Sequence, residues 1–172
     1  MKDYTALDLY RDLFRRMLRE KSEETVSNDS ADYARILIAE LLRSAQHEVW
    51  IYCTKFNGDV WSDKDVLDAL RAATGNRVVF HVLTRLAPDS GNEAVEILNA
   101  AKVDVKTIDR AKADSVPNRN FLVVDGISYR FEIDPEQRRG IACANGVKNA
   151  QSLIRAFQNL VAPEAPKDED AH

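Results

Sequence analysis

The sequence contains very little cysteine. Only Cys53 and Cys143 occur in its 172 residues, and neither has another Cys or a His at the spacing of metal ligands. Two such residues provide neither a disulfide framework nor a zinc site, and both stand in apolar, strand-like runs. We therefore expect two buried free thiols, and we predict no metal site and no cofactor.

Long apolar runs are also missing. No segment approaches the ~20 apolar residues that a bilayer-spanning helix needs. The N-terminal residues Met-Lys-Asp-Tyr-Thr lack the apolar core of a signal peptide. The sequence therefore predicts a cytoplasmic protein without a membrane partner.

A strong charge of one sign is absent from most of the chain. Of the net charge of −4, the segment from Ala162 onward holds −3, which leaves −1 for the rest. A nearly neutral body does not favour strong non-specific binding of nucleic acid. Basic side chains do gather around one region, and they would form a basic strip if they converged; acidic residues between them favour a mixed, solvated face instead. These basic residues are Arg110, Lys112, Arg119, Arg130, Arg138 and Arg139.

What the chain does contain is an alternation of strand-like and helix-like patterns. Apolar or β-branched runs at 48–54, 77–84, 103–108, 121–124, 127–131 and 141–144 predict strands, and helical stripes lie between several of them. Residues 108–117 read as a charged connector. Strands separated by helices predict an α/β sandwich in which helices flank a mixed sheet. We assign residues 31–161 to this domain and 162–172 to a flexible acidic tail.

The first 30 residues predict an N-terminal amphipathic helix and a connector. From Thr5 to Glu24, apolar residues such as Tyr10 and Met17 recur at helical spacing. Such a helix either packs on the core or docks a protein partner, and the pattern does not choose between the two. Residues 25–30 read as a polar connector to the domain.

The most informative stretch runs from Asn118 to Glu132. An apolar run ends at Asp125-Gly126, and a second run of β-formers follows, which predicts a β-hairpin with a type I′ turn. Because side chains alternate along a strand, Asn118 and Asn120 share one face while Arg119 points to the other. Asp125 belongs to the turn.

This segment resembles the His-x-Lys-x-x-x-x-Asp motif of the phospholipase D superfamily. Asn118 stands in place of the His, Asn120 in place of the Lys, and Asp125 at the position of the Asp. The Gly-Ser pair that usually follows is replaced by Glu132 and Ile133. The order of predicted elements over about residues 31–161 is similar to that of single-motif members, so the resemblance implies their fold and, because such members pair, a homodimer.

The two amides determine the functional prediction. In the family, the His forms a covalent phosphoenzyme and the Lys steadies the phosphoryl oxygens. An amide nitrogen has a delocalised lone pair, so Asn118 cannot replace the nucleophile, and Asn120 brings no positive charge. We therefore predict a catalytically inactive domain that acts by binding, as a regulatory or scaffolding subunit.

The nature of the ligand stays open at this stage. A residual phosphate site could combine Asn118 and Asn120 with Arg130 or Asn145, and Arg119, on the other face of the strand, is a further candidate for ligand binding. Equally, the old site could have become ordinary surface. The alternative function is a divergent nuclease or phosphodiesterase that uses other residues, for instance His81 or a metal held by Asp125 and Glu132. A third possibility is nucleic-acid binding without cleavage.

Overall fold

The computed structural model describes residues 4–116 and 119–163. These residues form one seven-stranded sheet in the order β1-β7-β6-β5-β2-β3-β4. The strands are β1 (Thr25–Asn28), β2 (Glu48–Cys53), β3 (Val79–Thr84), β4 (Val105–Thr107), β5 (Phe121–Val124), β6 (Ser128–Asp134) and β7 (Arg139–Cys143). The helices are α1 (Ala6–Glu20), α2 (Ala31–Ser44), α3 (Gly58–Trp61), α4 (Lys64–Gly75), α5 (Glu93–Ala100), α6 (Arg110–Ser115) and α7 (Val147–Val161).

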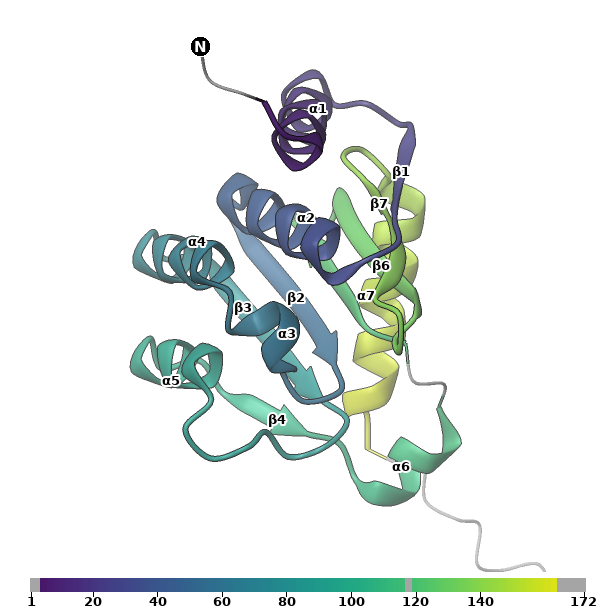
Figure 1. The fold of residues 1–172 in the computed structure, drawn as a ribbon. Coiled ribbons are helices and arrows are strands. Elements are labelled where there is room, and N and C mark those ends of the chain that lie inside the picture. Colours follow the sequence, from purple (N-terminus) through teal and green to yellow (C-terminus); the bar gives the residue numbers. More distant parts are fainter. Residues whose placement is uncertain (1–3, 117–118, 164–172) are drawn as a thin grey trace, which may run out of the picture.

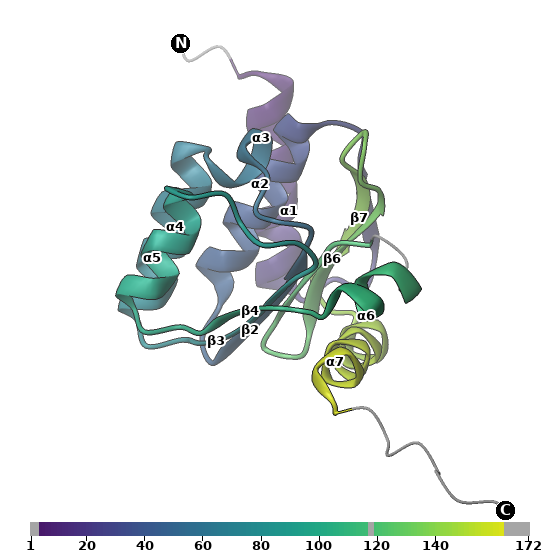
Figure 2. The same ribbon diagram turned by 90° about the horizontal axis from the view of Figure 1, so that it is seen from below.

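Helices cover the two faces of the sheet unequally. Figures 1 and 2 show α2, α3, α4 and α5 on one face and α7 with α6 on the other. β2, β3 and β4 run parallel, whereas β5, β6, β7 and β1 pair antiparallel. The prediction of an α/β fold with a mixed sheet flanked by helices is confirmed.

The parallel strands follow from their sequences. Val49 to Cys53 are all buried, as expected for a strand covered on both faces. β2 pairs with β3 from Glu48↔Val79 to Cys53↔Thr84. Parallel neighbours need a crossover, which α3 and α4 provide between β2 and β3, and α5 provides between β3 and β4.

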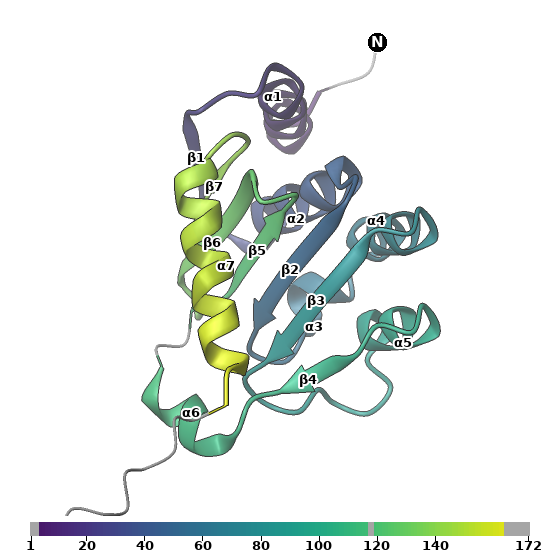
Figure 3. The same cartoon turned by 180° about the vertical axis from the view of Figure 1, so that it is seen from behind.

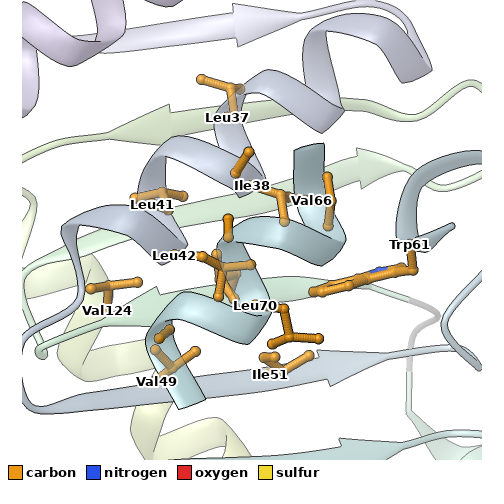
Figure 4. Packing of buried hydrophobic residues seen from close by; sticks show 14 of the residues in the cluster. Leu37, Ile38, Leu41, Leu42, Val49, Ile51, Trp61, Val66, Leu70 and Val124 are labelled. Carbon is orange, nitrogen blue, oxygen red and sulfur yellow. The ribbon is translucent and has the colours of Figure 1, made fainter. Parts of the chain in front are cut away.

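The larger core lies between the sheet and α2 with α4. The side chains of Leu37, Leu41 and Leu42 on α2 are almost completely buried, as is Leu70 on α4. In Figure 4, Leu42 and Leu70 lie near Val49 and Ile51 of β2, and Leu41 lies beside Val124 of β5. Each fully buried leucine contributes about 2 kcal/mol. A second cluster, on the opposite face, is built from Trp50, Tyr52, Phe121, Val123, Tyr129, Ile154 and Phe157.

The hairpin forms where the sequence predicts it. β5 and β6 pair from Phe121↔Phe131 to Val124↔Ser128. Asp125 and Gly126 have φ of 53° and 65°, the two positive values that a type I′ turn requires. The Ile127 N–H donates to the Val124 carbonyl at 3.0 Å and closes the turn.

The N-terminal segment differs from expectation at residues 25–28. The prediction of a polar connector is wrong there, because these residues form β1, which pairs antiparallel with β7. Alternation explains the error: Thr25 and Ser27 are exposed while Asn28 is buried, so the strand has no apolar run.

α1 packs on the domain, as one of the two readings of its pattern predicts. It begins at Thr5, which forms a capping box with Asp8, and it buries Phe14 and Met17 in the larger core. The division of the chain at residue 30 stays a prediction, although α1 and β1 join the same core and the same sheet.

Two other segments need comment. The connector predicted at 108–117 contains a short helix, α6, which buries Ala113. The acidic tail falls almost entirely outside the described residues, which end at Pro163. None of the described helices is long and apolar enough to cross a membrane.

Candidate functional site

The candidate site begins where the chain enters the hairpin. Asn120 precedes β5 and lies beside Thr54, which follows β2. The Thr54 hydroxyl donates to the Asn120 side-chain oxygen at 3.2 Å, and the Asn120 Nδ2 donates to Glu132 Oε1 at 2.8 Å. The side-chain amide of Asn120, which the resemblance predicts to stand in place of a Lys, is therefore bound to an internal carboxylate.

Glu132 forms a buried ion pair with Arg130. Their side chains are each 4% exposed, and Arg130 Nη1 lies 3.1 Å from Glu132 Oε2. Residues two apart on a strand share a face, so this charged pair points together toward the helices α2 and α3. The Arg130 guanidinium also donates to Asn28 Oδ1 at 3.3 Å and to the Arg138 carbonyl at 3.1 Å. Burial lowers the pKa of Arg130, and the charge of Glu132 opposes that effect.

Arg138 completes the cluster from the β6–β7 turn. Its guanidinium donates to both carboxylate oxygens of Asp59 at 2.8 and 3.2 Å, and it lies 3.5 Å from Glu132. Asp59 raises the pKa of Arg138 against the opposing effect of burial. Two guanidinium groups thus face two carboxylates, so the positive charge is balanced within the protein.

The cavity beside this cluster is small. It has a volume of about 30 Å³ and is bounded by Asn120, Arg130, Glu132 and Arg138 together with the apolar side chains of Ile38 and Trp61. A cavity of this volume holds about one water molecule. Among the residues described, this cavity is therefore smaller than a phosphodiester group.

Asp125 lies at the other end of the hairpin. Its carboxylate accepts hydrogen bonds from the backbone N–H groups of Gln46, His47 and Glu48 at 2.9, 2.8 and 2.9 Å. It therefore fixes the turn between α2 and β2. Asp125 and Glu132 do not converge, and no group of three or more metal-ligating side chains occurs among the residues described.

The other predicted site residues are dispersed. Asn118 lies outside the described residues. Arg119 is exposed, and its guanidinium donates to the Ile133 carbonyl. Asn145 follows β7, and its backbone N–H donates to the Ser22 carbonyl. The backbone N–H of the next residue, Gly146, donates to the carbonyl of Ile127 in the hairpin turn. The structure brings together Asn120 and Arg130, which both bind Glu132, whereas Asn145 lies elsewhere.

A ligand-binding role for Arg119, Arg130 or Asn145 stays a prediction.

The basic strip does not form as a continuous surface. Arg130 is buried, and Arg138 is bound to Asp59. Lys112 donates to the carbonyls of Leu160 and Ala162 at the end of α7, which suits the negative end of a helix dipole. With Arg119 bound to the Ile133 carbonyl and Arg139 lying 3.9 Å from Asp134, five of the six basic residues have a partner within the protein.

Neither described histidine lies at this cluster. His81 stacks on Trp50 on the opposite face of the sheet, with ring centroids 3.7 Å apart. His47 lies at the Asp125 end of the hairpin. Both cysteines are buried, as predicted, and burial raises the pKa of Cys53 to about 12.

One signal for the ion cluster is present in the sequence, but the prediction did not use it. Arg130 and Glu132 have opposite charges at positions i and i+2 of a strand, on the face that otherwise carries core residues. Asn28, Asp59 and Arg138 could not be added from the sequence, because they come from three separate segments.

Comparisons with solved structures identify the fold. Nuc from Salmonella typhimurium, a phospholipase D family member, superposes with a TM-score of 0.58 at 15% identity, over 80% of this chain and 94% of Nuc. NucT from Helicobacter pylori gives a TM-score of 0.57 at 11% identity, over 80% and 96% of the two chains. The protein has the phospholipase D-like fold.

A third match comes from a different kind of protein. TrmBL2, an archaeal chromatin protein with a novel mode of DNA binding, gives a TM-score of 0.56 at 13% identity, over 88% of this chain and 58% of TrmBL2. No family's sequence profile matches this phospholipase D-like chain, and no curated protein is similar to it in sequence.

Proposed function

We propose that this protein is a non-catalytic phospholipase D-like module that acts by binding, as a regulatory or scaffolding subunit. The observation that carries the proposal is the bond between Asn120 and the buried carboxylate of Glu132. At the hairpin end where the resemblance places a phosphate-binding Lys, this chain has an amide that is bound to its own carboxylate.

Electrostatics supports the loss of phosphate binding there. A phosphodiester that entered the site would have to displace Glu132 from Arg130 or lie beside a buried negative charge. Like charges at close range in a site of low dielectric cost several kcal/mol. The cavity of about 30 Å³ also leaves no room for both groups.

The chemistry of the two amides supports the loss of catalysis. Asn118 offers no nucleophile in place of the family's His, whatever its position, and Asn120 supplies no cation for the transition state. Loss of the nucleophile alone removes most of a rate enhancement of about 10⁶ or more.

A phosphodiesterase assay tests this proposal. We expect no turnover of bis(p-nitrophenyl) phosphate, single-stranded DNA or double-stranded DNA above the rate of a buffer control, with or without Mg²⁺ or Mn²⁺. Turnover that disappears in Asn118→Ala would contradict the proposal and indicate family-type catalysis.

The same assay examines the alternative, a divergent phosphodiesterase. Turnover that survives Asn118→Ala but is lost in His81→Ala would support it. The metal version is less favoured, because Asp125 and Glu132 lie at opposite ends of the hairpin and both are already engaged.

For the ligand of the module, nucleic acid is the first class to test. TrmBL2 supports this choice, because it shares the fold and is a DNA-binding chromatin protein. Binding through phosphate contacts would weaken steeply as salt rises. A titration of labelled double-stranded DNA at several salt concentrations is the measurement, and affinity that is absent or insensitive to salt would remove nucleic acid as the ligand.

A further inference from the structure

A groove lies on the other face of the sheet, away from the Glu132 cluster. It has a volume of about 330 Å³, and Trp50, Lys106 and Phe157 are among its lining residues. Figure 3 shows α7 over the antiparallel strands, while no described helix crosses β3 and β4 on this side. Parallel strands are ordinarily covered on both faces, so this portion of the sheet is unusual in its accessibility.

The indole of Trp50 is the unexplained feature of this groove. The residue is 8% exposed, and its Nε1 is buried without a hydrogen-bond acceptor among the residues described. A buried donor that lacks an acceptor is costly, and native proteins seldom retain one without a reason. An acceptor carried by a ligand would satisfy it.

The side chain of His81 covers the indole of Trp50. His81 stacks on the indole with an interplanar angle of 17°, and it remains 35% exposed on its solvent side. Its Nε2 lies 3.6 Å from Glu48 Oε2, and Glu48, two residues before Trp50 on β2, projects from the same face of the sheet. For a ligand to reach the indole from the groove, this imidazole would have to rotate away from it.

The charges of the groove fit one negative charge at most. Lys106 is 65% exposed and is the one ammonium that lines it, and its Nζ lies 3.6 Å from Asp104. A doubly charged phosphate would have only the Lys106 ammonium as a counter-charge here, and that ammonium already lies close to Asp104. A carboxylate can accept from both the Trp50 N–H and the Lys106 ammonium, which are donors of the strength that such a group needs.

The walls indicate the rest of the ligand. The rings of Phe157 and Trp50 pack edge to face, with their centroids 5.1 Å apart. The groove therefore has an aromatic wall beside the Trp50 N–H. Aromatic walls with a few convergent polar groups are typical of small-molecule sites, and the volume lies at the lower end of their range.

We propose that this groove binds a small planar aromatic carboxylate, whose carboxylate accepts hydrogen bonds from Trp50 Nε1 and Lys106 and whose ring packs against Phe157. The site is on the opposite face of the sheet from Glu132, so it does not depend on whether the hairpin end is inactive.

The two tryptophans of the chain make a direct test. The ¹⁵N–¹H spectrum of the full chain has one indole signal from Trp50 and one from Trp61, assigned with Trp50→Phe and Trp61→Phe. Naphthalene-2-carboxylate, added to millimolar concentration, should move the Trp50 indole proton downfield with saturation and leave the Trp61 signal in place. Naphthalene-2-methanol and acetate, which lack the charge and the ring respectively, should bind at least several-fold more weakly.

Variants check the two donors. Trp50→Phe keeps a ring but removes the N–H, and it should weaken binding about tenfold when affinity is measured by calorimetry, since this variant lacks the indole signal. Lys106→Met should weaken it several-fold, while Lys148→Met, an exposed lysine at the far end of α7, should not change it. The proposal is overturned if the Trp50 signal does not move, if all three probes move it alike, or if Lys106→Met and Lys148→Met bind equally.

Discussion

At the scale of single residues, Glu132 has the greatest consequence. Its buried carboxylate contacts the side chains of Asn120, Arg130 and Arg138. Because Arg138 also binds Asp59, these contacts connect the hairpin with α3. A buried ion pair adds little stability compared with an apolar pair of similar volume, but removal of one partner leaves an unpaired buried charge. Position 132 is therefore a place where one neutral substitution has a large effect.

We predict that Glu132→Gln lowers the free energy of unfolding by about 3 kcal/mol, because Arg130 loses its counter-charge in the interior. Urea denaturation followed by circular dichroism measures the change. Glu136→Gln, at an exposed position of the same turn region, serves as the control and should stay within about 0.5 kcal/mol of the unmodified protein. The double variant Arg130→Met with Glu132→Leu should lose less than Glu132→Gln alone. A Glu132→Gln protein as stable as the control would show that the pair contributes no such constraint.

At the scale of elements, two acidic residues join segments that are distant in the sequence. Asp125 in the hairpin turn binds three consecutive backbone N–H groups at the start of β2. Asp65 in the first turn of α4 binds Arg11 of α1 and Arg43 of α2. Each carboxylate thus fixes the position of one element against another.

Two substitutions of Asp125 should distinguish the stability that comes from its hydrogen bonds from the stability that depends on the backbone conformation of the turn. Asp125→Ala removes the acceptor of three N–H groups and puts alanine at a φ of 53°, so we expect a loss of about 3 kcal/mol or more. Asp125→Asn tolerates the left-handed conformation and keeps one acceptor oxygen, so its loss should be about half as large. Asp114→Ala on α6 is the exposed control. Equal losses for the Ala and Asn variants would mean that backbone strain is negligible here.

Asp65 predicts a dependence of stability on acid pH. Burial opposes ionisation of this carboxyl, but Arg43 and Arg11 together hold its pKa below the ordinary value of about 3.9. The stabilisation is therefore fully present above about pH 4 and is lost as pH falls through the lower pKa of the folded state.

Urea midpoints measured between about pH 7 and about pH 3 test whether stability falls as the pH is lowered. The unmodified protein should lose more stability over that interval than Asp65→Asn, which has no carboxyl to protonate at this position. Asp12→Asn, on the exposed side of α1, should behave like the unmodified protein. An identical pH profile for Asp65→Asn would contradict the assigned role.

At the scale of the whole molecule, the two faces of the sheet differ in chemistry. One face carries the larger apolar core and, at its hairpin end, the closed ion cluster. The other carries the smaller core and the open groove beside Trp50. If both proposals hold, recognition takes place on the face opposite the one where the resemblance places phosphoryl transfer.

The homodimer implied by the phospholipase D resemblance stays a prediction. We expect a mass of about twice 19.4 kDa from size-exclusion chromatography with light scattering. A monomeric mass that does not change with protein concentration would contradict it, and would show that this chain does not pair as single-motif members do.

The sequence alone determined the elements whose signals are local. The apolar runs of β2 and β3, the Asp125-Gly126 turn and the stripe of α2 each depend on neighbours in the chain, so periodicity and turn chemistry suffice to predict them. Motif spacing then located the hairpin within a phospholipase D-like order of elements. β1 was missed because its pattern is polar and its stability comes from pairing with β7, more than 100 residues away.

The tertiary structure decided what the motif residues do. A carboxylate such as Asp125 looks the same in sequence whether it faces a ligand or caps a turn, and only the fold shows that it holds Gln46, His47 and Glu48. The contacts of Glu132 with Asn120 and Arg130, and the unsatisfied indole of Trp50 on the opposite face, likewise depend on which side chains meet across distant strands and helices. Burial and hydrogen bonding depend on contacts between residues that are distant in the sequence, and no local sequence pattern encodes them.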